Sequence, residues 1–223
     1  MAGTYVVTGA SRGIGLEFCR QLSKRGERVI GVTRSPAPAL AELGVRTELA
    51  DVTNPAQVAA LGQRLAGEAV DVLINNAGVS SKANRLDDLS LEELARVFAV
   101  NASSPLVVTR AMMPGLRAGA RRLIINISSQ LGSITNNTGG SSYPYRASKA
   151  ALNMLTVSLA NELRPEGFTC VTVHPGWVQT DMGGPNATLT PPQAVASMLG
   201  VFDKLTAGDT GRFLNYDGKT LPW

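Results

Sequence analysis

The sequence predicts an α/β fold built on a doubly wound parallel sheet of about seven strands flanked by helices. Short runs rich in β-branched residues alternate along the chain with segments of helical periodicity. Most of these runs are apolar on both faces, as expected for parallel strands that helices cover on each side. No linker or change in composition divides the chain, so residues 1–223 are expected to form a single domain.

Seven runs are the expected strands, and turn or helix signals follow each of them. They are Thr4–Thr8, Arg28–Thr33 and residues 45–49, 71–75, 122–128, 168–174 and 212–216. Two polar, loop-like stretches, residues 132–144 and 181–190, follow the ends of expected strands. Loops at such positions border the ligand site in open α/β sheets.

Helix signals lie between the strands. Gly26 ends the first helix, Asn54 followed by Pro55 begins the second, and Ser90 with Glu93 forms a capping box for another. The expected helices cover residues 14–25, 55–66, 91–101, 104–116 and 145–163, and a last one begins at residues 190–191. The alternation of strands and helices is that of a Rossmann-type domain.

The composition excludes several classes of protein. Of 223 residues, 44% are hydrophobic and 17% are charged, which suits a folded core and not a disordered tail or coiled coil. The net charge is only +4 and no basic cluster exceeds Arg121–Arg122, so no nucleic-acid partner is expected. No apolar run approaches the roughly 20 residues of a membrane span. The first residues lack a basic segment, so a signal peptide is not expected. A cytoplasmic location is expected instead.

Metal and disulfide chemistry are not expected either. Cys19 and Cys170 stand in apolar surroundings without a CxxC pattern, which favours reduced, buried thiols. His174 is the only histidine, so no zinc ligand set converges. A structural role for His174 at a strand end is favoured over a role as general base.

A glycine-rich turn after the first strand points to a dinucleotide. Residues 8–15 read TGASRGIG and lead into the first helix. Gly9, Gly13 and Gly15 permit a tight turn and close approach of a phosphate to the backbone, and the helix N-terminus attracts the negative charge. Glycine triplets also occur in purely structural turns. Nucleotide binding is therefore predicted from the position of this triplet, at the first strand-to-helix turn of the sheet.

The second strand indicates which dinucleotide is bound. An acidic residue at its end would bind the ribose hydroxyls of NAD, but the strand ends in Val-Thr-Arg-Ser with no carboxylate. Arg34 and Arg12 can instead pair with a 2′-phosphate through charge-assisted hydrogen bonds. The alternative is that both are ordinary surface arginines. NADPH/NADP is therefore the expected cofactor.

Tyr145 and Lys149 are the candidate reacting pair. They stand four residues apart, on one face of an expected helix at the carboxyl edge of the sheet. Because tyrosine ordinarily titrates near ~10, the neighbouring ammonium is expected to lower the pKa of Tyr145. Tyr143 is a rival phenol, but Ala147 stands four residues after it.

Six motifs in order resemble the short-chain dehydrogenase/reductase family over nearly the whole chain. They are TGASRGIG, Asp51–Val52, Asn75-Asn76-Ala77-Gly78, Ser128–Ser129, YRASK and Pro175–Gly176. The tail, with HPGWVQTDMGG and the closing Asp217–Trp223 segment, is similar to the C-factor-like carbonyl reductase branch.

The resemblance implies a set of site residues. Tyr145 would exchange the proton, Lys149 would lower its pKa and hold the nicotinamide ribose, Ser129 would bind the substrate oxygen, and Asn101 would order a water in a proton relay. Asn75 could equally be a turn former. The implied cofactor-binding set is Gly9, Ser11, Arg12, Gly13, Ile14, Gly15, Arg34, Asp51, Val52, Asn75, Ala77, Gly78, Tyr145, Lys149, Pro175, Gly176, Val178 and Thr180.

The implied activity is NADPH-dependent reduction of ketones or aldehydes to alcohols, with a small-molecule carbonyl or alcohol as partner. The alternatives are a 3-oxoacyl carrier-protein reductase and a dinucleotide-binding signalling protein with little turnover. The lid at residues 181–190 is short for the family, which predicts an open site. Its expected apolar wall, which could instead be core packing, is Leu131, Ile134, Tyr143, Trp177 and Met182. Family members commonly pair through the two long helices, here expected over residues 104–116 and 145–163. The resemblance therefore implies a homodimer or homotetramer, with a monomer as the alternative.

Overall fold

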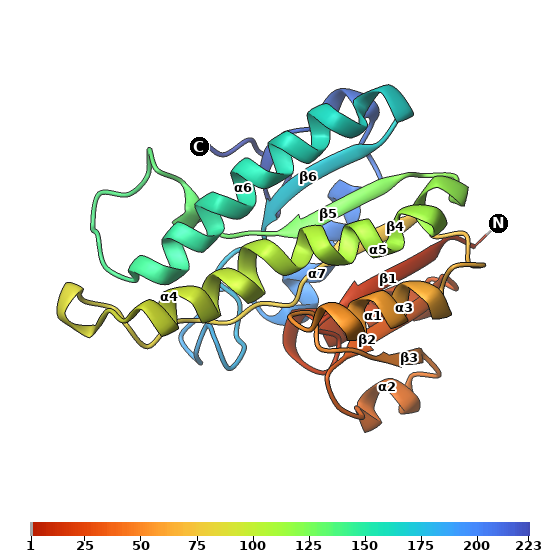
Figure 1. Ribbon diagram of the computed structural model, residues 1–223, viewed down its shortest axis with the longest axis horizontal. Coiled ribbons are helices and arrows are strands. Elements are labelled where there is room, and N and C mark those ends of the chain that lie inside the picture. The colour runs from red at the N-terminus through yellow and green to blue at the C-terminus, as the bar shows by residue number, and fades with distance from the viewer. Residues whose placement is uncertain (1) are drawn as a thin grey trace.

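The computed structural model describes residues 2–223 and contains one seven-stranded parallel sheet (Figure 1). The strand order is β3-β2-β1-β4-β5-β6-β7, and every neighbouring pair is parallel. The order reverses between β1 and β4, where the connections leave in opposite directions and a crevice opens at the carboxyl edge. The strands are β1 (Thr4–Thr8), β2 (Arg28–Thr33), β3 (Arg46–Leu49), β4 (Val72–Asn75), β5 (Leu123–Ile127), β6 (Thr169–His174) and β7 (Phe213–Asn215).

Helices cover both faces of the sheet. In Figure 1, α3, α5 and α6 lie on the near face, while α1 and α7 lie behind the strands. The α-helices are α1 (Gly13–Lys24), α2 (Pro38–Glu42), α3 (Pro55–Arg64), α4 (Leu91–Phe98), α5 (Ser104–Ala118), α6 (Tyr143–Leu163) and α7 (Pro191–Phe202). The shorter turns are η1 (Leu86–Asp88), η2 (Ala99–Ser103, a π-helical turn), η3 (Gln130–Gly132), η4 (Arg164–Glu166) and η5 (Ala207–Asp209).

The two layers enclose two separate hydrophobic cores. Alternate residues of one strand serve both: Val7 of β1 packs with α1 and α7, and Val6 packs with α3 and α5. All five residues of β1 and all five of β5 are buried. The apolar, non-alternating strand pattern of the sequence is thereby explained, and the predicted doubly wound sheet is confirmed.

Two local elements differ from expectation. The five-residue helix α2 was not expected, because Pro36 and Pro38 make this stretch read as a loop. The helix expected over residues 91–101 ends as an α-helix at Phe98 and continues as the π-helical turn η2, without a break before α5. A π-helical turn of this kind often accompanies a functional site, and here it contains Asn101.

A chain of buried side-chain hydrogen bonds joins the sheet to α5 and α6. The Asn75 amide Nδ2 donates to Asn126 Oδ1 at 2.9 Å and to Thr109 Oγ1 at 3.2 Å. Asn126 Nδ2 donates to Thr156 Oγ1 at 2.8 Å, and that hydroxyl donates to the Leu152 carbonyl at 2.7 Å. Because buried polar groups are costly when unpaired, these bonds fix the register between the strand ends and the helices.

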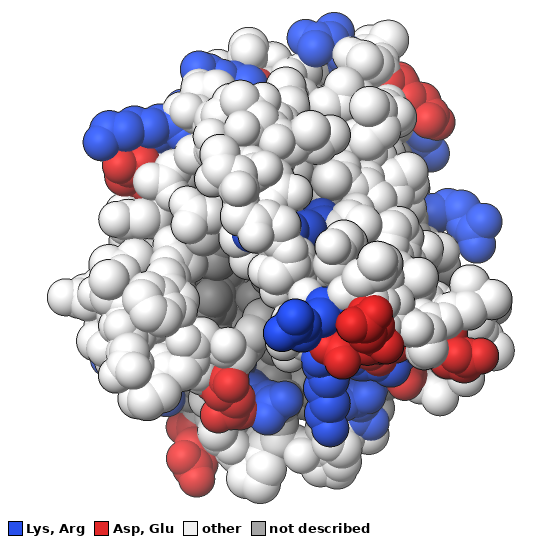
Figure 2. Space-filling model, turned by 90° about the vertical axis from the view of Figure 1, so that its left-hand side faces the viewer, with Lys and Arg blue, Asp and Glu red and all other residues white. Residues whose placement is uncertain are grey.

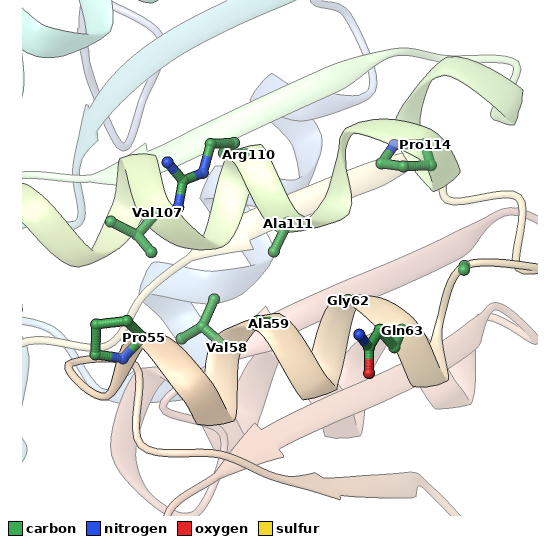
Figure 3. A pocket seen from close by; sticks show the side chains of 10 residues that line it. Pro55, Val58, Ala59, Gly62, Gln63, Val107, Arg110, Ala111 and Pro114 are labelled. Atoms are coloured by element: carbon green, nitrogen blue, oxygen red, sulfur yellow. The ribbon is translucent and has the colours of Figure 1, made fainter.

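A hollow of about 310 Å³ lies between α3 and α5. Figure 3 shows Val58, Ala59 and Gly62 on one helix facing Val107 and Ala111 on the other. The helices approach closely there, since a Cβ on Gly62 would lie 2.8 Å from the Ala111 carbonyl oxygen. Apart from Arg110 and Gln63, the residues around this hollow carry no polar side chain.

None of the helices within residues 2–223 has both the length and the apolar character that crossing a membrane requires.

Replacing Asn126 by alanine should destabilise the fold. The substitution removes the acceptor that Asn126 offers to the Asn75 amide and the donor that it offers to the Thr156 hydroxyl, and it opens a small cavity. The free energy of unfolding should therefore fall by about 2–4 kcal/mol. Urea denaturation followed by circular dichroism measures this change. Asn161→Ala, on the exposed side of α6, is the control and should change the free energy by less than about 0.5 kcal/mol. A loss below about 1 kcal/mol for Asn126→Ala would contradict a stabilising role for the bridge.

Candidate active site

The turn between β1 and α1 is built from glycines that no other residue could replace without strain or collision. Gly9 and Gly13 have positive φ angles of 66° and 55°. A Cβ on Gly15 would lie 2.2 Å from the Gly9 carbonyl oxygen, and one on Gly9 would lie 2.8 Å from the Ala77 Cα. The unpaired N–H groups of the first turn of α1 therefore remain accessible, which is the arrangement that binds phosphate at a helix N-terminus.

Asn76 fixes this turn, and sequence reasoning missed it. Its amide Nδ2 donates to the carbonyls of Thr8 at 2.9 Å and Gly9 at 3.2 Å. In return, the Thr8 hydroxyl oxygen accepts from the N–H groups of Asn76 and Ala77 at 3.0 and 3.1 Å. The signal was present in the Asn75–Gly78 motif, but the sequence could not tell which of its two asparagines faces the turn.

Two basic residues, Arg12 and Arg34, lie around this turn. The end of β2 carries no carboxylate. Arg12, at the N-cap of α1, forms a 2.6 Å ion pair with Asp181, and both side chains are exposed. Arg34 directly follows β2 and lies close enough to Asp51 to contribute to lowering the pKa of that carboxyl group. The main causes of that lowered pKa are the hydroxyl and N–H of Thr53, which donate to Asp51 at 2.7 and 2.9 Å. The pairing of Arg12 with Asp181 was not expected.

Tyr145 and Lys149 lie on one face of α6, in its first two turns, as the sequence predicts. The helix forms through its alanine-rich stretch after Pro144, which stands at the second helical position. Lys149 is 4% exposed, and its Nζ donates to the Ile127 carbonyl at the end of β5 at 2.8 Å. Burial lowers the pKa of Lys149 to about 8.

The expected direction for the pKa of Tyr145 is wrong in this structure. Burial raises the pKa of Tyr145, and a hydrogen bond with the Ser129 side chain lowers it only in part. The Lys149 Nζ lies 5.8 Å from the centre of the phenol ring and donates to the Ile127 carbonyl. Desolvation of the phenol therefore outweighs the influence of the ammonium.

Ser129 and Asn101 complete the group that the sequence analysis assembled. Ser129 caps η3, and its hydroxyl oxygen accepts from the Leu131 N–H at 3.1 Å. Asn101 is fully buried in η2, where its Oδ1 accepts from the Val79 N–H at 2.8 Å and its Nδ2 donates to the Val79 carbonyl at 2.9 Å. The π-helical turn directs Asn101 towards this segment.

Gly78 and Ser148 connect Asn101 to the reacting pair. A Cβ on Gly78 would lie 3.4 Å from the Asn101 Oδ1 and 3.8 Å from the Lys149 Nζ, so the backbone of Gly78 lies beside both. Asn101 Nδ2 also donates to the Ser148 hydroxyl at 3.1 Å, and that hydroxyl donates to the Tyr145 carbonyl at 2.8 Å. The sequence analysis did not single out Ser148.

The segment after β6 folds back on itself as a short lid over residues 181–190. Val178 pairs with Leu189, and the Trp177 Nε1 donates to the Gly183 carbonyl at 2.8 Å. Gly176, with φ at 84°, has no room for a Cβ beside Leu189, while Thr180 lies against Gly13 of the glycine turn. The positions predicted after Pro175 therefore border the crevice at the carboxyl edge of the sheet.

The rim of the site carries exposed apolar side chains. Figure 2 looks onto the end of the molecule that holds α4 and the loop before α6, and shows a hollow with a largely uncharged rim. Four of the five expected wall residues are exposed, and Leu131 is half-buried. The exposed ones are Ile134, Tyr143, Trp177 and Met182.

The side chain of Asn75 is a correction to the predicted cofactor contacts. It is 2% exposed and engaged with Asn126 and Thr109 below the crevice, because the strand pleat turns it towards α5. Val52 is also buried, within the core beneath α3, whereas Ser11 is exposed and Ile14 is half-buried at the glycine turn.

His174 ends β6 and is buried, and its Nδ1 has no hydrogen-bond partner within the described chain. Burial lowers its pKa to about 4, so the ring is neutral near pH 7. Among residues 2–223, no three His, Cys, Asp or Glu side chains are grouped to hold a metal ion.

The assembled groups can perform acid–base chemistry on an oxygen atom next to a bound nucleotide. The Ser129 hydroxyl and the Tyr145 phenol can both hydrogen-bond one substrate oxygen, since they interact with each other at the mouth of the crevice. Lys149 supplies a positive charge below them, and the glycine turn lies across the crevice behind Gly78.

Comparison with known proteins agrees with this geometry. Residues 4–188 match the family model of the short chain dehydrogenases. C-signal of Myxococcus xanthus is 54% identical over 154 residues, covering 69% of this chain and 93% of that protein. The NADPH-bound carbonyl reductase from chicken fatty liver is 37% identical, with a TM-score of 0.93 over 100% of this chain and 99% of the other. A short-chain dehydrogenase/reductase from Burkholderia multivorans with bound NADP is 34% identical, with a TM-score of 0.91 over 100% of both chains. The chain therefore belongs to the short-chain dehydrogenase/reductase family.

Proposed function

We propose that this protein is an NADPH-dependent carbonyl reductase that converts ketones or aldehydes to alcohols. The observation that carries the proposal is the assembly of Asn101, Ser129, Tyr145 and Lys149 at the carboxyl edge of the sheet, facing the glycine turn. The carbonyl reductase named above, with its bound NADPH, supports this assignment of substrate class and cofactor.

The residues at the crevice fit NADPH. Gly9 and Gly15 let the turn close tightly against Ala77 and Asn76. The first N–H groups of α1 at this turn are the groups that would bind a pyrophosphate. Arg34 follows β2 with no carboxylate at the end of that strand, so a 2′-phosphate would meet a positive charge there and no carboxylate from β2. Arg12 can bind the same phosphate if it gives up its ion pair with Asp181. Breaking that ion pair costs little free energy, because both side chains are exposed. Bound NADPH supplies the hydride.

The chain's own residues supply the proton and the orientation. Ser129 and Tyr145 hydrogen-bond the substrate carbonyl oxygen, and Tyr145 donates the proton as negative charge develops there. The Lys149 ammonium stabilises the phenolate that remains and holds the ribose hydroxyls beside Gly78. Asn101 orders the Val79 segment and the water through which the proton is replaced. His174 takes no part, because its neutral ring points into the interior.

The open, apolar rim suits carbonyl compounds of varied shape, and the short lid weakens the exclusion of water. A 3-oxoacyl carrier-protein reductase remains an alternative, for which an acetoacetyl thioester is the diagnostic substrate. The similarity to C-signal makes a signalling role a second alternative. The complete Asn-Ser-Tyr-Lys set favours turnover over binding alone.

Replacing Tyr145 by phenylalanine should abolish most of the activity. The loss of the proton donor should lower kcat by roughly 10²–10⁴-fold, measured as NADPH oxidation with a panel of ketones, aldehydes and an acetoacetyl thioester. Tyr143→Phe is the matched control, since Tyr143 lies exposed at the start of the same helix, and it should stay within a few-fold of wild type. If wild type and Tyr145→Phe are equally inert towards the whole panel, the enzyme proposal is wrong.

Arg34 should determine the preference for NADPH over NADH. Arg34→Gln removes a charged partner of the 2′-phosphate, so KM for NADPH should rise about 10-fold while KM for NADH stays nearly constant. Steady-state kinetics with both nucleotides measures the ratio, and Arg110→Gln on α5 is the control. A wild-type preference for NADH at equal concentration would overturn the assignment of the cofactor.

Lys149 should make the stability of the folded protein depend on pH. Its pKa in the fold is about 8, below the ordinary 10.5, so the unfolded chain binds more protons between these values and wild-type stability rises with pH across that window. The stability advantage of Lys149→Met over wild type should therefore shrink between pH 7.5 and 10.5 by up to about 3 kcal/mol.

Urea denaturation at a series of pH values measures this difference. Lys204→Met, at an exposed position after α7, is the control for loss of a lysine side chain and should change the free energy of unfolding by less than about 0.5 kcal/mol. A difference between Lys149→Met and wild type that stays constant with pH would mean that Lys149 is not desolvated in the fold.

A further inference from the structure

A second cavity, of about 560 Å³, lies between η3, the loop that follows it and the first turn of α6. The residues that matter here are Gln130 and Leu131 from η3, Thr135, Asn136 and Thr138 from the loop, and Arg146 from α6. The cavity adjoins the candidate active site along the chain, because Gln130 follows Ser129 and Arg146 follows Tyr145.

Arg146 carries a guanidinium group that the protein leaves unpaired. Its Nε is buried and has no hydrogen-bond partner. Within residues 2–223 no carboxylate lies within ion-pairing distance of it, whereas arginines such as Arg46, Arg96 and Arg117 all pair with glutamates. An unsatisfied buried donor on a charged group is costly, so its retention requires an explanation, and a bound anion supplies one.

The rest of the cavity lining suits an anion. It contains no Asp or Glu. The side chains of Thr135, Asn136 and Thr138 are exposed and form no hydrogen bond with the described part of the chain, so their hydroxyl and amide groups are free to donate. The N-terminus of the 21-residue helix α6 lies at the same end and adds a partial positive charge.

The geometry of a guanidinium group selects a planar, two-oxygen partner. Two N–H groups of a guanidinium form a fork that matches the two oxygens of a carboxylate, which makes such pairs stronger and more specific than contacts with a single charge. A simple neutral ketone has one oxygen and no charge, so it cannot fill both positions of this fork while that oxygen is held at Tyr145. A substrate with both a carbonyl and a carboxylate could place the first at Tyr145 and the second at Arg146.

We propose that the cavity at Arg146 binds the carboxylate of an acidic carbonyl substrate, so that oxo acids are the preferred substrate class. This inference rests on the proposed carbonyl reductase function for its substrate, but the binding site itself can be tested without turnover.

The test compares an oxo acid with its own methyl ester, 4-oxopentanoate being one such pair. Wild type should favour the acid, and Arg146→Gln should lower the ratio of kcat/KM for acid over ester by about 10- to 100-fold. Arg146→Lys keeps the charge without the fork and should recover part of the ratio. Arg110→Gln, in the hollow between α3 and α5, is the matched control and should leave the ratio unchanged. Thermal melting checks that each variant is folded.

Binding of an unreactive carboxylate separates this proposal from the proposed function. Pentanoate and pentanamide are titrated into the protein by calorimetry, and pentanoate alone should bind, with at least a 10-fold loss in Arg146→Gln. If wild type reduces no carbonyl compound but this loss is seen, the anion site stands and the reductase proposal fails. If wild type reduces the ester but Arg146→Gln leaves both the acid/ester ratio and pentanoate binding unchanged, the anion site is refuted and the reductase proposal stands.

A phosphate is the competing anion. Acetoacetyl-pantetheine with and without its 4′-phosphate forms a second pair of substrates. If Arg146→Gln lowers the activity towards the phosphorylated compound and not towards the oxo acid, the carboxylate assignment is overturned.

Discussion

The docking of α6 on the carboxyl end of β5 is the constraint on which the rest of the site depends. Lys149 donates to the Ile127 carbonyl at 2.8 Å, and Asn153 Oδ1 accepts from the Ser128 hydroxyl at 2.7 Å. Gly132 permits the approach, since a Cβ there would lie 2.8 Å from the Lys149 backbone. These contacts place polar groups in a nearly dry interface, where a shift of the helix would leave several of them unpaired. These contacts fix the position of Tyr145 relative to the carboxyl end of β5.

The glycine turn is connected to this helix through one short segment of chain. Asn76 donates to the carbonyls of Thr8 and Gly9, and Gly78, two residues on, lies beside Asn101 and Lys149. The segment therefore contacts the glycine turn at one end and lies beside Asn101 and Lys149 at the other. Its position at the reversal of strand order explains why two halves of the chain meet there. A rigid link of this kind fixes the distance over which a hydride would pass.

Much of the fold could be predicted because its signals are local. All seven expected runs contain strands, and the apolar ones, such as β1 and β5, are buried on both faces and satisfy their backbone groups through the sheet. The helix α2 escaped prediction because its five residues, which begin at Pro38, carry too little periodicity. Asn75 and Asn76 could not be told apart, because strand pleat decides which of the two faces the crevice.

The electrostatics of the site were less predictable than its members. The Tyr145–Lys149 spacing identified the pair, but the sign of the change in the pKa of Tyr145 depends on burial, which the spacing does not contain. The ion pair of Arg12 with Asp181 joins residues 169 positions apart, and the unpaired state of Arg146 is visible only once its surroundings are known. In both cases the sequence shows an arginine but does not show which groups surround it in the fold.

The central claim is that this site moves hydride from NADPH to a carbonyl carbon. The most direct measurement supplies NADPH carrying deuterium at the transferable C4 position, together with a ketone, and examines the alcohol by mass spectrometry. The account predicts that each molecule of alcohol gains one deuterium on the former carbonyl carbon. Oxidation of NADPH without deuterated alcohol, or alcohol whose added hydrogen comes from water, would contradict it.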